Sequence, residues 1–439
     1  MRGTLRELLR YPSAVAGLCI LALLVGLSVY AVVAIPYGEA IRLWSGGEAA
    51  WPRNPRLARP EWLNWLAGGQ LPRTLVVRAG APVRERDLGG GVRQAEWDLA
   101  FSYPYRRFPP ELAVFFQADY RDQAPQVELG WRKPDGTRTP LAVLSPRRQD
   151  IYRVSADAEL RRALGGAPEV VLFSSPDRPG QAVPGSYALE VRAFLFEPGS
   201  AVRAELVVYG EVHGLAGTDH LRRDLLLPLL WGTPIALAFG LLAAVGSSLS
   251  TLCIAAVGAW YGGWVDGLIQ RVTEVNLILP GLPILIMIGT LYSRSLWVIL
   301  SAVILLGIFG GGIKTYRALF LQVKEAPYVE AARAYGAGNL RIVFFYLIPR
   351  AIPVLLPQFV TLIPGFVFLE ATLALLGLGD PVLPTWGKVI EDAYRAGALY
   401  VGHAYWVLEP AFLLMLSGLS FTLLGFALDR VFNPRLREL

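Results

Sequence analysis

The side chains in this chain that could carry out chemistry do not form a catalytic or metal-binding set. His213, His220 and His403 share no ligand spacing, and the two cysteines lie in apolar runs rather than in the polar part of the chain. No phosphate-binding loop of the type G-x-x-x-x-G-K-[ST] occurs. We therefore expect no enzymatic activity, no metal and no nucleotide bound to this chain.

One short polar segment has residue types suited to contact with another protein. Its marked residues are Glu330, Ala331, Ala332, Gly336, Arg341 and Pro349. Glutamate and alanine favour a helix, and the alanines are small enough for a partner surface to approach closely. Gly336 can take the positive φ that ends one helix, and Pro349 suits the first turn of the next. An amphipathic helix without a partner is the alternative interpretation.

The composition is typical of a membrane protein. Of the 439 residues, 54% are hydrophobic and only 17% are charged, against roughly 25% in an average soluble domain. The mean hydropathy is +0.43. The net charge of +6 does not indicate nucleic-acid binding, because the basic residues are scattered and many flank apolar segments.

Six apolar segments are long enough to cross a bilayer as helices, which takes about 20 residues. They cover residues 13–35, 225–259, 269–291, 295–320, 351–378 and 407–432. A basic flank of Arg2, Arg6 and Arg10 precedes the first and places the N-terminus in the cytoplasm. A cleaved signal peptide is disfavoured, because its apolar core usually has about 7–15 residues.

Alternation of these segments predicts which parts of the chain lie on each side of the membrane. Residues 36–216 fall outside, whereas the loop 324–350 and both termini fall in the cytoplasm. Basic residues flank that loop and end the chain, as the positive-inside rule requires. The predicted organisation is thus 1–35 with the first helix, an outer domain at 36–216, and a core of five helices at 217–439.

The outer region has the alternation of β-strands. Residues 112–120, 187–195 and 202–208 alternate apolar and polar side chains. Pro134-Asp135-Gly136 is typical of a turn and lies between two further predicted strands. Residues 156–164 favour a short helix. We predict an all-β, sandwich-like domain between about residues 74 and 210.

The polar segment at 330–349 resembles the coupling loop of ATP-binding-cassette import permeases. Further motifs resemble, in the same order, the second permease of the dipeptide/oligopeptide/nickel import family. They lie at residues 217–219, 223–224, 261–266, 375–379, 384–387 and 433–436. One departure is Arg222, which stands where that family usually has glycine, and another is the length of the outer region.

The resemblance implies a fold and a set of partners. The fold would be an α-helical polytopic membrane protein, a type I importer permease with six transmembrane helices, carrying the β domain as an extracytoplasmic insert. The partners would be a second homologous permease, two ATPase subunits, an extracytoplasmic solute-binding protein and the lipid bilayer, with no nucleic acid. ATP and Mg would bind the ATPases, so this chain would hold no cofactor. The location would be a bacterial or archaeal cytoplasmic membrane.

Polar residues inside the apolar segments are candidates for function. Gln358 and Thr361 could line a translocation path, and interhelical hydrogen bonds are the alternative. Glu274 and Glu370 lie near segment ends, where packing or interface contacts are the simpler explanation.

Three questions of function stay open at this point. We expect an imported peptide, whereas relatives of this kind also carry nickel chelates or oligosaccharides, and no residue decides among them. A membrane-anchored β-sandwich receptor or sensor is the alternative from another class, although it would have no need of a coupling loop. The outer domain could serve as a docking platform for the binding protein or as a passive spacer.

Overall fold

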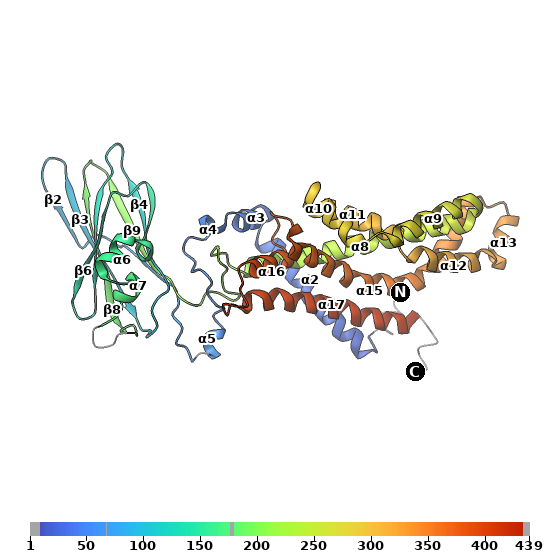
Figure 1. Ribbon diagram of the computed structural model, residues 1–439, viewed down its shortest axis with the longest axis horizontal. Helices are drawn as coiled ribbons and strands as arrows, with labels where there is room; N and C mark the ends of the chain where they lie inside the picture. Colours follow the sequence, from blue (N-terminus) through green and yellow to red (C-terminus); the bar gives the residue numbers. More distant parts are fainter. Residues whose placement is uncertain (1–8, 67, 176–179, 433–439) are drawn as a thin grey trace. The chain divides into compact units, whose positions relative to one another are not determined.

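The computed structural model describes residues 9–66, 68–175 and 180–432 (Figure 1). The chain divides into two compact units, an insert of Gly46–Leu226 and a membrane unit formed by Met1–Ser45 with Leu227–Leu439. The insert was expected at 36–216, so both of its limits lie ten residues further along the chain. The motif residues 433–436 fall outside the described residues.

Local contacts explain where the insert begins. Helix α3 (Tyr37–Ser45) follows the first span directly, and its Tyr37 ring packs 5.7 Å from that of Trp231, so α3 belongs with the membrane unit. At the other end, the Thr218 hydroxyl donates to the Pro55 carbonyl at 2.7 Å. This contact keeps the residues just before the next span within the insert.

The insert contains two antiparallel sheets. One has the order β1 (Leu75–Arg78), β9 (Ala201–Val208), β4 (Leu112–Asp119), β7 (Gln149–Arg153). The other has the order β2 (Arg84–Asp87), β3 (Arg93–Tyr103), β8 (Gly185–Leu195), β5 (Gln126–Arg132), β6 (Arg138–Leu144). Both sheets contribute to a single apolar core, with Trp97 and Val191 from one and Val114 and Leu206 from the other. The predicted strands are confirmed, and the two sheets form a sandwich.

The turns of the insert follow from their residues. Pro134-Asp135-Gly136 closes the β5–β6 hairpin, where the Lys133 amide donates to the Thr137 carbonyl at 2.9 Å. The predicted helix at 156–164 was placed too early. A 3₁₀ turn covers Val154–Ala156, and α6 (Ala158–Leu164) starts only after Asp157, whose carboxylate caps it by accepting from two backbone amides. The other short helices are α4 (Gly47–Ala50), α5 (Leu63–Leu66) and α7 (Pro168–Val171).

In the membrane unit, four described helices are long and apolar enough to cross a bilayer. Three of them are α2 (Pro12–Ala34), α8 (Leu226–Tyr261) and α17 (Tyr405–Phe432). The fourth, Leu355–Leu378, takes in most of α15 (Ile348–Leu373) and the five residues that follow it. Two bent pairs raise the number to six if each pair is one span: α9 (Gly263–Ile278) with α10 (Gly281–Leu291), bent by 79°, and α11 (Leu296–Ile308) with α12 (Gly312–Lys324), bent by 46°.

The structure corrects the expectation of one continuous helix for each of the third and fourth spans. Pro280 lies at the first break, where its ring prevents an unbroken helix, and Gly310-Gly311 lies at the second. The remaining elements are α13 (Pro327–Ala334), α14 (Asn339–Ile342), π-helical segments at Val343–Leu347 and Ala374–Leu378, and α16 (Trp386–Arg395). Helix α16 lies between the fifth and sixth apolar segments, where the sequence has no apolar run.

Glycines allow the long helices to approach one another closely. A Cβ on Gly240 of α8 would lie 2.6 Å from Val367 of α15, and one on Gly425 of α17 would lie 2.3 Å from the Thr361 methyl. Gly232 of α8 faces the Trp386 indole in the same way, at 2.4 Å. Trp386 is fully buried and joins the apolar cluster between α8, α15 and α17.

Candidate functional site

Helix α13 carries the Glu-Ala-Ala motif with one face buried and the other open. It starts at Pro327, whose missing amide hydrogen is not needed in a first turn. Val329 is completely buried and Ala332 nearly so, whereas Glu330 and Ala331 are exposed. Glu330 lies in the first turn, where a negative charge interacts favourably with the helix dipole. The outer face of α13 is therefore available to a partner.

The position of Ala332 corrects one expectation. Both alanines were expected to allow close approach of a partner, but only Ala331 is exposed. Ala332 is 7% exposed and lies on the same inward face as Val329, three residues earlier in the helix. Its small size serves packing within this chain.

The turn after α13 has the geometry of a Schellman motif. Gly336 has a φ of +80°, and its amide donates to the Arg333 carbonyl at 2.9 Å. The Ala337 amide donates to the Ala332 carbonyl at 3.0 Å, which completes the motif. Tyr335 is 92% exposed beside this turn. The predicted role of Gly336 in ending the helix is confirmed.

Two basic residues attach the segment to the end of α8. The Arg333 guanidinium lies 4.4 Å from the centre of the Trp260 ring, a cation–π distance. The Lys324 ammonium donates to the carbonyls of Ala259 and Trp260 at 3.1 and 3.0 Å, which belong to the last turn of α8. These contacts were not predicted, although the position of Trp260 at the end of an apolar run was a usable signal.

An ion pair and an apolar cluster complete the support of this segment. Two guanidinium nitrogens of Arg317 in α12, Nε and Nη2, donate to the two carboxylate oxygens of Asp266 in α9, at 2.7 and 2.6 Å. Apolar residues from both sides of the turn pack with the end of α8. They are Leu252, Ala255, Ala256, Ala259, Trp260, Ile313, Tyr316, Phe320, Val329, Ile342, Val343, Leu347, Ala351 and Leu355. A displacement of α13 is therefore opposed by contacts with α8, α12 and α15.

The two other predicted residues of the segment lie on its continuation. Arg341 is exposed in α14, and Pro349 is exposed in the first turn of α15. Proline at this position confirms the predicted start of the fifth apolar helix. The structure thus places Glu330, Ala331, Arg341 and Pro349 at the surface of one continuous stretch.

Gln358 and Thr361 lie together on α15, apart in sequence from the segment just described. The Gln358 side-chain oxygen accepts from the Tyr316 hydroxyl at 3.1 Å, and the Thr361 hydroxyl donates to the Gln358 carbonyl at 2.9 Å. Both residues are nevertheless exposed. The hydrogen bond of Gln358 agrees with the interpretation as an interhelical contact. The exposure of both side chains agrees with a translocation path, so both interpretations stay predictions.

The two acidic candidates have different surroundings. Glu274 lies 3.8 Å from Arg271 on an exposed face of α9, which is a weak surface pair. Glu370 is only 5% exposed and hydrogen-bonds to Thr385, the residue that caps α16. Neither residue lies with the segment at 330–349 in a single site.

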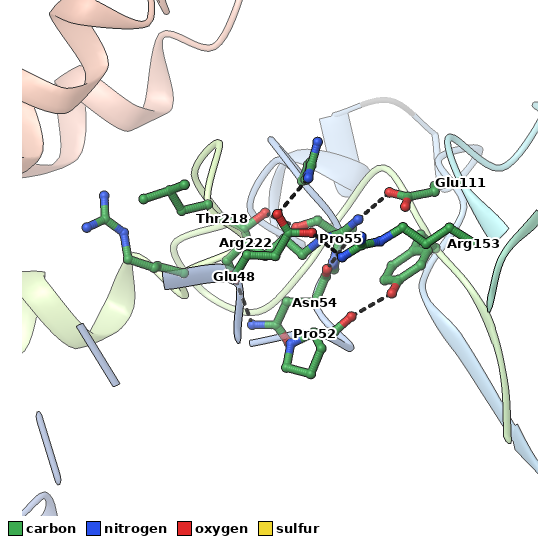
Figure 2. A network of polar contacts seen from close by, with 12 residues as sticks. Glu48, Pro52, Asn54, Pro55, Glu111, Arg153, Thr218 and Arg222 are labelled. Atoms are coloured by element: carbon green, nitrogen blue, oxygen red, sulfur yellow. Dashed lines mark hydrogen bonds and ion pairs between the residues drawn. The ribbon is translucent and has the colours of Figure 1, made fainter. Parts of the chain in front are cut away.

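A second polar cluster surrounds Arg222 in the insert (Figure 2). Its guanidinium donates to the Asn54 carbonyl at 2.7 Å and to the Glu48 carboxylate at 3.2 Å, and it pairs with Glu111. It also lies 4.5 Å from the centre of the Tyr209 ring. The side chain is 1% exposed, so this is a buried charge that is well compensated.

The backbone of Arg222 explains why glycine would fit there. Its φ is +63°, a left-handed conformation that costs a non-glycine residue about 1–2 kcal/mol. The side-chain contacts offset this strain. They join the segment around Glu48 and Asn54 to the start of β4 and to the turn that precedes α8 (Figure 2).

Glu48 is the acceptor that the arginines share. Its carboxylate also accepts hydrogen bonds from the guanidinium groups of Arg56, at 2.6 Å, and Arg153, at 2.8 Å. Burial acts to raise the pKa of Glu48, but hydrogen bonds from Arg56 and Arg222 outweigh it and leave the pKa below its usual value. The carboxylate therefore stays ionised at neutral pH and holds the three guanidinium groups together.

Replacing Arg222 should loosen the insert in a graded way. We expect Arg222→Gly to lower its free energy of unfolding by about 2–4 kcal/mol, because Glu111 and Glu48 lose a buried partner. Arg222→Ala should lower it by about 1 kcal/mol more, since alanine keeps the backbone strain. Hydrogen–deuterium exchange of peptides from residues 46–226 measures both. The exposed Arg78→Ala, which removes only a surface pair with Glu205, is the control; equal exchange in all three variants would contradict the role of Arg222.

The comparisons with known proteins concern the membrane unit. Residues 246–438 match the family model described as "binding-protein-dependent transport system inner membrane component". The chain is 30% identical to a dipeptide transport system permease protein of Alkalihalophilus pseudofirmus, over 51% of this chain and 72% of the relative. It is 31% identical to the dipeptide transport system permease protein of Bacillus subtilis, over 51% and 69%. It is 28% identical to a glutathione transport system permease protein of Pectobacterium atrosepticum, over 51% and 73%.

Proposed function

Because this chain belongs to the family of binding-protein-dependent transport permeases, an inner-membrane component of ABC peptide transport systems, we propose that it couples solute passage to separate ATPase subunits through the exposed face of α13. The observation that carries the proposal is the combination of an open outer face with a strongly supported inner one. Glu330 and Ala331 are exposed, while Val329 is buried against the end of α8. A partner that binds such a surface can displace α13, and the buried contacts can transmit the displacement to the other helices.

The contacts suggest how a displacement of α13 would reach the other helices. Closure of two ATPases on ATP would displace α13, and the Arg333–Trp260 and Lys324 contacts would transmit the displacement to α8. The apolar cluster would transmit it to the start of α15, which carries Gln358 and Thr361. Transport would then be a shift of population between two packings of the helices, biased by ATP-bound and ADP-bound partners.

We assign the remaining partners and the substrate as part of the same proposal. A second, related permease would share the translocation path, and a solute-binding protein would deliver the ligand outside. Relatives named for dipeptides and glutathione support a small peptide as the substrate. Nickel chelates or oligosaccharides could use the same machinery. ATP and Mg would bind only to the ATPases.

The orientation in the membrane follows from the same reasoning. The N- and C-termini and the segment at 324–350 would lie in the cytoplasm, where the ATPases are. The insert would lie outside, where the binding protein is. The basic residues in and near α13, among them Arg333 and Arg341, support this orientation.

Purification of the tagged chain in a mild detergent, followed by mass spectrometry of accompanying proteins, tests this proposal. We expect two ATPases with phosphate-binding loops and a second multi-span permease. Recovery of the chain alone, under conditions that keep a known importer intact, would contradict the assembly. It would also favour the alternative of a membrane-anchored receptor with a β-sandwich outer domain.

A further inference from the structure

The insert displays a small patch of large apolar side chains that its own core does not cover. Trp65 is 83% exposed, Leu66 80%, Leu215 68% and Trp62 44%. They come from α5 with its flanking residues and from the segment that precedes α8. Figure 1 shows α5 outside the two sheets of the insert. Exposed tryptophans beside leucines form an apolar surface that needs an explanation.

Hydrogen bonds hold this patch in place. Asn64, between the two tryptophans, is only 6% exposed and bonds both the amide and the carbonyl of Leu71, at 3.1 and 3.2 Å. The Trp62 indole N–H donates to the Leu215 carbonyl at 3.1 Å, and the Glu61 amide donates to the Gly214 carbonyl at 2.9 Å. The apolar side chains are therefore presented outward by an ordered backbone.

The loop that carries the two tryptophans has little charge. Within residues 60–72, Glu61 is the only ionisable residue of the sequence, and its carboxylate lies 3.4 Å from the Arg73 guanidinium. The apolar side chains thus meet no unpaired carboxylate from their own loop. Such a surface suits an environment that is apolar on one side and wet on the other.

The patch belongs to the end of the insert that leads into the membrane helices. The Leu57 amide donates to the Asp219 carbonyl at 3.1 Å, and the Thr218 amide donates to the Ala58 carbonyl at 2.8 Å. These bonds tie the residues before α5 to the turn that precedes α8. The insert ends at Leu226, and α8 begins at that same residue.

We propose that Trp62, Trp65, Leu66 and Leu215 insert into the interfacial layer of the lipid bilayer and attach the insert to the membrane surface. Tryptophan is enriched at this depth because its ring is apolar and its N–H is polar. The near neutrality of the loop indicates attachment through apolar contact rather than through acidic lipid headgroups. This surface is distinct from α13 and does not depend on coupling to an ATPase.

Fluorescent labels in nanodiscs test the proposal on the full chain. Cys19→Ala and Cys253→Ala give a cysteine-free background, and an environment-sensitive dye is then attached to Trp65→Cys or to Leu215→Cys. The second variant keeps the Trp62 bond, because the acceptor is the main-chain oxygen of residue 215. We expect a blue-shifted emission at both positions and quenching by lipids that carry a spin label near the headgroup.

Val83→Cys is the matched control, because Val83 is 75% exposed and precedes β2 in the sandwich. Its label should stay unquenched. Equal and weak quenching at positions 65, 215 and 83 would overturn the proposal. Protection of position 65 that needs an added soluble protein, and that occurs equally in detergent, would also overturn it and assign the patch to a protein partner.

Discussion

Replacing Gly336 with valine is expected to reduce substrate uptake by about tenfold or more while the chain stays inserted in the membrane. The φ of +80° is required by the Schellman turn, and a β-branched residue there costs of order 1–3 kcal/mol. Among the described residues, no neighbouring atom lies within 4 Å of a Cβ at this position, so the effect arises from the backbone rather than from a clash. The turn would open, and the outer face of α13 would lose its fixed orientation.

Gly338→Val is a matched control for this experiment. Gly338 is also exposed with no atom within 4 Å of a Cβ, but its φ is −69°, which valine adopts without strain. Uptake of a labelled dipeptide by proteoliposomes that contain the assembled importer, together with ATP hydrolysis, measures coupling. We expect hydrolysis without uptake in Gly336→Val and normal behaviour in Gly338→Val. Equal uptake in both variants would show that the turn has no role in coupling.

Glu330→Lys should give the same uncoupled behaviour for an electrostatic reason. Glu330 is exposed in the first turn of α13, where a positive charge opposes the helix dipole. It also reverses the charge that a partner would meet. Wild-type uptake in this variant would show that the charge on the exposed face of α13 is not needed for coupling. Only the turn at Gly336 would then keep a role in coupling.

Gly232→Ala is expected to destabilise the membrane unit, although it adds only one methyl group. The new Cβ would lie 2.4 Å from the Trp386 ring, which is fully buried and donates its N–H to the Leu229 carbonyl at 3.0 Å. The indole cannot move without breaking that bond, so we expect a cost of about 1–3 kcal/mol. The midpoint of thermal unfolding in detergent should fall by several degrees.

Gly365→Ala provides the comparison, because it adds the same methyl group within α15 and meets no atom within 4 Å. Alanine favours a helix over glycine, so this variant should be neutral or slightly more stable. A similar fall in both variants would mean that general loss of glycine flexibility, and not the contact with Trp386, determines the effect. The contact gives Trp386, which lies in the motif at residues 384–387, a packing role against Gly232.

The parts of the fold that follow from local sequence were predictable. Strands β4, β8 and β9 alternate apolar and polar side chains because one face of each is buried in the sandwich. Strand β2 was missed because all four of its residues are polar and exposed, so only its pairing with β3 makes it a strand. Helix α16 was missed because it is short and charged, with a buried face that tertiary contacts supply.

In the candidate site, too, local features were predictable and tertiary contacts were not. The end of α13 at Gly336 was predictable, because glycine is the residue that adopts the required φ at low cost. The inward orientation of Ala332 was not, since alanine favours neither face of a helix. The contacts of Lys324 and Arg333 with the end of α8 join residues more than sixty positions apart, and no local pattern in the sequence reports such a pairing.

The place where the chain enters and leaves the sandwich has a consequence for the history of such a domain. Leu75 of β1 is paired with Val208 of β9, and the Gly210 amide donates to the Thr74 hydroxyl oxygen at 3.0 Å. The two ends of the sandwich therefore meet, and a short link could replace everything between them. A module closed in this way can be gained or lost by a single insertion or deletion in a gene, without lengthening the connection that stays behind.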